Sequence, residues 1–88
     1  MAKKAISYYI LLPGDNEEDT FYEDNLLGES DINGSFWPGS GLKALMKISC
    51  DNKELLPEIR IITDQKKSLT VEQFLTDLGK LKVKKYAI

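Results

Sequence analysis

The clearest pattern of apolar and polar positions lies near the start of the chain, between residues 4 and 12. Every second residue there is apolar, and the residues between them are mostly apolar as well. This alternation predicts a β-strand, and apolar character on both faces is typical of a strand in the middle of a sheet. One face would carry Ile6, Tyr8, Ile10 and Leu12. Pro13 and Gly14 would end the strand.

Two later stretches have the spacing of helices. Residues 41–49 follow Ser40, a residue type that caps helices, and Leu42, Leu45 and Met46 would share one face. The second helix has the stronger start signal, because Thr70-Val71-Glu72-Gln73 is a capping box whose hydroxyl and amide groups satisfy backbone N–H groups. Its core-facing stripe would consist of Phe74, Leu75, Leu78 and Leu81. Gly79 lowers helix propensity by about 1 kcal/mol relative to alanine, so this end would fray or approach a neighbour closely.

A β-hairpin is predicted around Asn33 and Gly34, because both residues tolerate the positive φ of a type I′ turn. Short strands would flank this turn at residues 29–32 and 35–37. Alternating isoleucines predict a further strand at 58–63.

A final strand is expected at residues 83–87. The pattern as a whole predicts a single α+β domain over residues 1–88, with a mixed or antiparallel sheet of about three to five strands packed against two helices.

Charge is distributed unevenly along the chain. Residues 5–42 contain eight acids and no Lys or Arg, whereas the chain from Lys43 onward carries ten basic residues against six acids. The formal net charge of −2 conceals this division. Opposed charges of this kind can steer a partner or a second copy of the chain over about 8–10 Å in physiological salt.

The stretch from residue 15 to residue 24 is the most acidic part of the chain. Because unpaired carboxylates are costly to bury, a solvated loop is favoured, held to the core by Phe21 and Tyr22. The spacing of these two residues with Leu26 and Leu27 is also compatible with one or two helical turns. A calcium-binding EF-hand loop is disfavoured: in a register that begins at Asp15, Thr20 replaces the turn glycine and Leu26 replaces the bidentate glutamate.

The same acids suit a docking surface for a basic protein, because patterned carboxylates complement a basic groove. Phe36 and Trp37 are expected either to join the core or to anchor an interface, since aromatic residues concentrate binding energy. The residues predicted to contact a protein partner are Asp15, Glu17, Glu18, Asp19, Glu23, Asp24, Phe36 and Trp37.

An alternative site lies just before the first helix. Gly39, Ser40 and Gly41 with Lys43 could hold a small anion or a nucleotide, because the helix N-terminus offers free N–H groups and the lysine adds a full charge. The segment has neither the phosphate-loop spacing nor the dinucleotide fingerprint, so plain helix capping is the competing interpretation.

Ordinary catalytic triads are excluded, because the sequence contains no histidine and Cys50 has no such base to activate it. A carboxylate-based hydrolase is a distant alternative, for which no pair of acids has a diagnostic spacing. We therefore predict a non-enzymatic protein-binding domain, with no metal and no cofactor. Self-association is a further expectation.

The chain has one cysteine, no signal-peptide pattern at its start and no apolar run near the roughly 20 residues that span a bilayer. These features predict a cytoplasmic protein without membrane contact. The acidic balance does not favour nucleic acid as a partner. In its small size the chain resembles the accessory proteins that phages encode.

Overall fold

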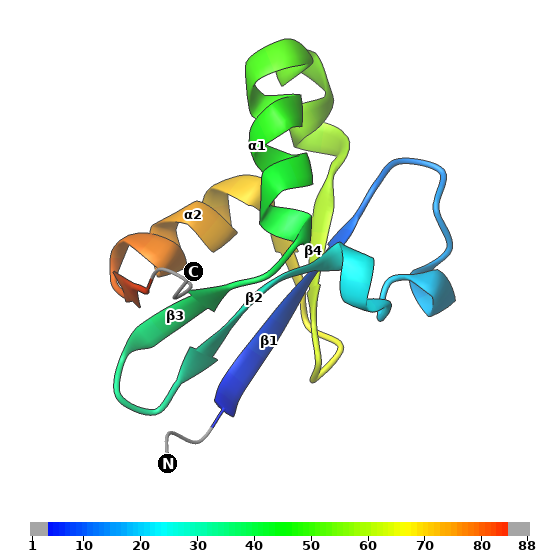
Figure 1. Cartoon of the computed structure of the whole chain (residues 1–88). Helices are drawn as coiled ribbons and strands as arrows, with labels where there is room; N and C mark the ends of the chain where they lie inside the picture. The colour runs from blue at the N-terminus through cyan, green and yellow to red at the C-terminus, as the bar shows by residue number, and fades with distance from the viewer. Residues whose placement is uncertain (1–3, 85–88) are drawn as a thin grey trace.

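The computed structural model describes residues 4–84, which contain two α-helices, three short 3₁₀ helices and six strands. The strands form one mixed sheet in the order β5-β4-β1-β2-β3-β6. Figure 1 labels its four middle strands, β4, β1, β2 and β3. Their bounds are β1 Lys4–Leu11, β2 Leu26–Asp31, β3 Ser35–Pro38, β4 Arg60–Thr63, β5 Ser68–Thr70 and β6 Lys82–Val83. The helices are α1 Gly41–Asp51, α2 Val71–Gly79, and the 3₁₀ helices η1 Glu17–Asp19, η2 Glu23–Asn25 and η3 Lys53–Glu58.

The α+β class predicted from the sequence is confirmed, whereas the sheet has more strands than the three to five expected. The additional strand is β5, which borders the sheet and is three residues long. The predicted final strand begins one residue early, as β6, which pairs parallel to β3. The part of that prediction covering residues 85–87 lies outside the described residues.

The first strand occupies the middle of the sheet, as its two apolar faces predict. It pairs antiparallel with β2 on one side and with β4 on the other. Tyr8 and Ile10 are buried on the face that the helices cover, and Ile61 of β4 lies beside Ile10 on that face. Tyr9 and Ile62 pair across the same two strands and point to the opposite face.

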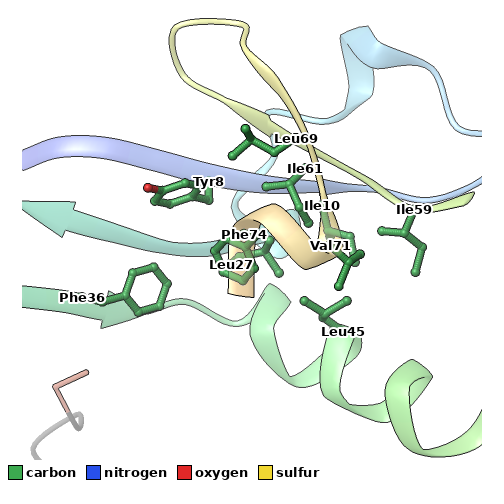
Figure 2. Packing of buried hydrophobic residues seen from close by; sticks show 10 residues of the cluster. All are labelled: Tyr8, Ile10, Leu27, Phe36, Leu45, Ile59, Ile61, Leu69, Val71 and Phe74. Carbon is green, nitrogen blue, oxygen red and sulfur yellow. The ribbon is translucent and has the colours of Figure 1, made fainter. Parts of the chain in front are cut away.

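The hydrophobic core lies between the sheet and the two α-helices. Figure 2 shows Leu45 of α1 and Val71 and Phe74 of α2 turned toward buried strand residues. Three aromatic rings form the centre: Phe74 lies with its centroid 5.2 Å from that of Tyr8 and 6.0 Å from that of Phe36. Tilted rings at these separations stabilise a core beyond the area they bury.

The capping box at the start of α2 is confirmed. The backbone N–H of Gln73 donates to Thr70 Oγ1 at 3.1 Å, and the N–H of Thr70 donates to Gln73 Oε1 at 2.9 Å. Ser40 behaves differently before α1. Its backbone is already helical, and its hydroxyl donates to the carbonyl oxygen of Glu23 at 3.2 Å. Ser40 thus ties α1 to the acidic stretch.

Two apolar side chains predicted to face the core are exposed. Met46 of α1 is 60% exposed and Leu75 of α2 is 51% exposed, whereas their neighbours Leu45 and Phe74 are buried. Successive residues of an α-helix are about 100° apart around its axis, so a helix with a narrow contact turns the next residue toward solvent. The sequence pattern therefore predicted a wider core-facing stripe on each helix than the structure shows.

The predicted hairpin forms, with a different turn. β2 and β3 pair antiparallel and are joined by three residues, 32–34, and the N–H of Gly34 donates to the carbonyl oxygen of Asp31 at 3.2 Å. Gly34 has a φ of 81°, whereas Asn33 does not adopt positive φ. This matches a three-residue loop that ends in a left-handed glycine, in place of the expected type I′ turn.

Candidate functional site

The acidic segment, defined here as residues 15–24, has a regular backbone. It contains η1 and the first two residues of η2. In each of these turns, backbone N–H groups donate to carbonyl oxygens three residues earlier. Thr20 N–H donates to Glu17 O at 3.1 Å, and Asn25 N–H donates to Tyr22 O at 2.9 Å. The solvated loop expected from the sequence is therefore folded into two consecutive turns.

Side chains attach the acidic segment to the rest of the domain. Thr20 is buried, and the ring of Phe21 lies edge-on to the ring of Tyr9, with centroids 5.2 Å apart. Asn25 Nδ2 donates to the carbonyl oxygen of Asp19 at 3.1 Å, which joins the two turns to each other. Of the two anchors predicted from the sequence, Phe21 makes this ring contact, whereas Tyr22 is mostly exposed.

All six carboxylates of the segment face solvent. Among the residues that the structure describes, none of these carboxylates takes part in an ion pair or a side-chain hydrogen bond. The group consists of Asp15, Glu17, Glu18, Asp19, Glu23 and Asp24. A concentrated set of exposed negative charges on a folded backbone can attract a basic surface.

Phe36 and Trp37 have opposite environments, because consecutive residues of a strand point to opposite faces. Phe36 is buried in the aromatic centre of the core, so its side chain is removed from the predicted contact surface. Trp37 is 43% exposed on the face away from the helices. In residues 4–84, no hydrogen bond or ring contact joins Trp37 to the acidic segment.

Asp31 organises the hairpin next to Trp37, a role that the sequence did not reveal. Its Oδ1 accepts from the backbone N–H groups of Asn33 and Ser35 at 2.9 and 3.0 Å, and its Oδ2 accepts from Trp37 Nε1 at 2.9 Å. Trp37 is thereby held in one orientation. These bonds, of which that from Trp37 has the largest effect, hold the pKa of Asp31 below its ordinary value. The nearby charge of Lys84 also lowers this pKa, whereas burial of the carboxyl raises it.

This arrangement predicts a pH-dependent stability. A carboxyl whose pKa is lowered on folding stabilises the protein above its unfolded-state pKa, near 3.8, and loses that contribution as pH falls through the lower folded-state pKa. Asp31→Asn should therefore lower the free energy of unfolding at pH 7, and its difference from the parent protein should shrink below about pH 4. Urea denaturation at pH 7 and at about pH 2.5 measures both values. Asp24→Asn, at an exposed acid, is the control, and a deficit for Asp31→Asn that is equal at both pH values would contradict the assignment.

The glycines of the predicted anion site have a packing role. A Cβ on Gly39 would collide with the backbone oxygen of Leu26, and a Cβ on Gly41 would lie 2.7–2.9 Å from backbone atoms of Asn25 and Leu26. Glycine is needed here so that the segment before β2 can approach the start of α1. The Cβ side of both glycines is therefore occupied by the backbone of residues 25–26.

The remaining opening near this helix start is a hollow of about 350 Å³ lined by Glu23, Leu26, Gly39, Ser40 and Lys43. The structure thus brings the two predicted sites together: Lys43 shares the hollow with Glu23. A carboxylate beside the lysine opposes the binding of an anion there. Plain structural use of the glycine segment fits this geometry better than ligand binding.

A second hollow, which the sequence did not reveal, lies under the acidic segment. It measures about 370 Å³ and is lined by Glu17, Glu18, Phe21, Ile62 and Lys66. The only signal for it in the sequence is an aromatic residue within a run of acids. Ile62 was predicted to be a strand residue, but its position below Phe21 depends on how the segment folds back over β4.

Within residues 4–84, no three His, Cys, Asp or Glu side chains are grouped so that they could hold a metal ion. In the same range neither α-helix has the length and apolar character that crossing a membrane requires.

The residues and their geometry define a small α+β protein with a mixed sheet, helices on one face and an acidic segment beside the other. In comparisons with known proteins, no family model matches the chain, and no curated protein and no solved structure matches it significantly. The function is therefore inferred from the chemistry of the site.

Proposed function

We propose that this chain is a non-enzymatic binding domain that docks its acidic segment onto a basic surface of a protein partner. The observation that carries the proposal is the presentation of six exposed carboxylates on a backbone closed by hydrogen bonds. A partner with matching positive charge would gain a faster encounter and a fixed orientation. The order already present in the segment reduces the entropy lost on binding.

Trp37 is proposed as a second contact. Its ring is held by the bond to Asp31 and stays partly exposed, so little side-chain freedom is lost when a partner covers it. A second copy of the chain also has suitable charges, because its C-terminal half is rich in lysine. Light scattering on the purified protein tests this form of the proposal.

The experiment is affinity capture of partners from the cell that makes the protein. The test variant neutralises four acids of the segment: Asp15→Asn, Glu17→Gln, Glu18→Gln and Asp19→Asn. A matched control removes the same four charges elsewhere, at exposed positions: Asp51→Asn, Glu54→Gln, Glu58→Gln and Glu72→Gln. Net charge is then equal in the two variants.

We expect a stoichiometric protein partner that the parent and the control capture and the test variant does not. A partner that all three proteins capture equally would overturn docking through the acidic segment. Capture of no partner, together with a monomeric mass by light scattering, would overturn stable docking altogether.

A further inference from the structure

The hollow under the acidic segment combines three kinds of surface. Ile62 is buried and forms an apolar floor, and Phe21 offers a ring that is 40% exposed and is supported by its edge contact with Tyr9. Glu17 and Glu18 of η1 add two carboxylates. The site therefore consists of a cavity with an aromatic wall and an apolar floor, in addition to its charge.

These surfaces match one type of side chain. A long aliphatic stem that ends in a planar cation can cover an apolar floor, stack on a ring and donate to carboxylates at the same time. Arginine has this combination, whereas the ammonium of lysine is a compact and strongly hydrated charge that stacks less well. Two carboxylates against the single cation of Lys66 disfavour an anion in the same place.

We infer that this hollow receives an arginine side chain of the basic partner, with its guanidinium over Phe21 and beside Glu17 and Glu18. The inference deepens the proposed function and rests on it, because it names the partner residue that the acidic segment recognises. Lys66 lies at the same hollow and repels the incoming cation. Removing the charge of Lys66 is therefore expected to strengthen binding, an effect opposite in sign to the loss caused by the glutamate substitutions.

The test uses two capped nonapeptides that differ only in carrying arginine or lysine at alternating positions. Each is titrated into the full chain at low salt, and the dissociation constant is read from backbone amide shifts by NMR. We expect the arginine peptide to bind about twofold to fivefold more tightly than the lysine peptide. The largest shifts should fall on the residues that line the hollow.

Five variants separate the hollow from general attraction by charge. Glu17→Gln with Glu18→Gln should weaken the arginine peptide about threefold more than Glu23→Gln with Asp24→Asn, which removes the same charge outside the hollow. Phe21→Leu should abolish the preference for arginine, whereas Tyr22→Leu, at an exposed neighbouring ring, should preserve it. Lys66→Gln should tighten binding about twofold. Because Lys66 is exposed, this last variant keeps the test valid even if Phe21→Leu disturbs the segment.

The outcomes distinguish the two proposals. Equal affinity for both peptides, or equal losses from the two pairs of acid substitutions, would overturn the arginine site while leaving docking by the acidic segment in place. Weaker binding by Lys66→Gln would also overturn the site, because removing a positive charge beside a bound guanidinium should strengthen its binding. Failure of both peptides to bind at low salt would count against the arginine site and the proposed function together.

Discussion

Phe74→Ala is expected to lower the free energy of unfolding by about 3–5 kcal/mol, the largest effect that we predict for a single substitution. The ring of Phe74 is completely buried and lies in contact with the rings of Tyr8 and Phe36. Its removal leaves a cavity at the meeting point of α2 and the sheet. In a domain of this size, the loss would consume a large share of a total stability of about 5–15 kcal/mol.

Urea denaturation followed by circular dichroism measures this effect. The matched control is Leu75→Ala, at the next position of the same helix, where the side chain is about half exposed. We expect this control to cost less than about 1 kcal/mol. Similar losses for the two variants would contradict the assignment of α2's buried face.

Gly28→Ala is expected to cost about 3 kcal/mol, by overpacking instead of by a cavity. Gly28 lies in β2 opposite Pro38 of β3, and a Cβ added there would collide with Phe36 Cζ and lie 2.7 Å from the carbonyl oxygen of Trp37. Neither group can move freely, since Phe36 is packed in the core and the oxygen belongs to the backbone. The substitution should therefore displace the ring or separate the two strands.

Gly79→Ala is the control for Gly28→Ala. At Gly79, the last residue of α2, an added Cβ would meet no described atom within 4 Å. The higher helix propensity of alanine should then raise stability by about 0.5–1 kcal/mol. Thermal or urea unfolding should show that the free energy of unfolding falls in Gly28→Ala and rises in Gly79→Ala. An unchanged free energy of unfolding in Gly28→Ala would contradict the close packing of Phe36 against β2.

Local signals in the sequence predicted much of the fold. The apolar residues on both faces of residues 4–12 identified the central strand, which pairs with β2 along one edge and with β4 along the other. The Thr70 and Gln73 pair identified the start of α2, because a capping box requires only residues that are close in sequence. The strand β5 was missed because three residues are too few to show a period.

The candidate site was harder to predict, because its geometry depends on contacts between distant parts of the chain. Gly39 and Gly41 were predicted as an alternative anion site, and nothing in the sequence indicates that the backbone of residues 25–26 packs closely against them. Phe36 and Trp37 looked like one aromatic patch, and the alternation of β3 sends them to opposite faces. The acids of the segment are exposed, as the prediction of a solvated stretch requires, and the helical turns that hold them match the alternative that the spacing of the apolar residues left open.

The most direct test of docking by the acidic segment is the salt dependence of affinity for the captured partner. Dissociation constants are measured over a range of salt concentrations for the parent, for the variant neutralised in the segment and for the control neutralised elsewhere. We predict weaker binding and a shallower salt dependence for the segment variant than for the parent. The control should have the same affinity and the same salt dependence as the parent. Equal affinity and equal salt dependence in all three proteins would contradict the proposal.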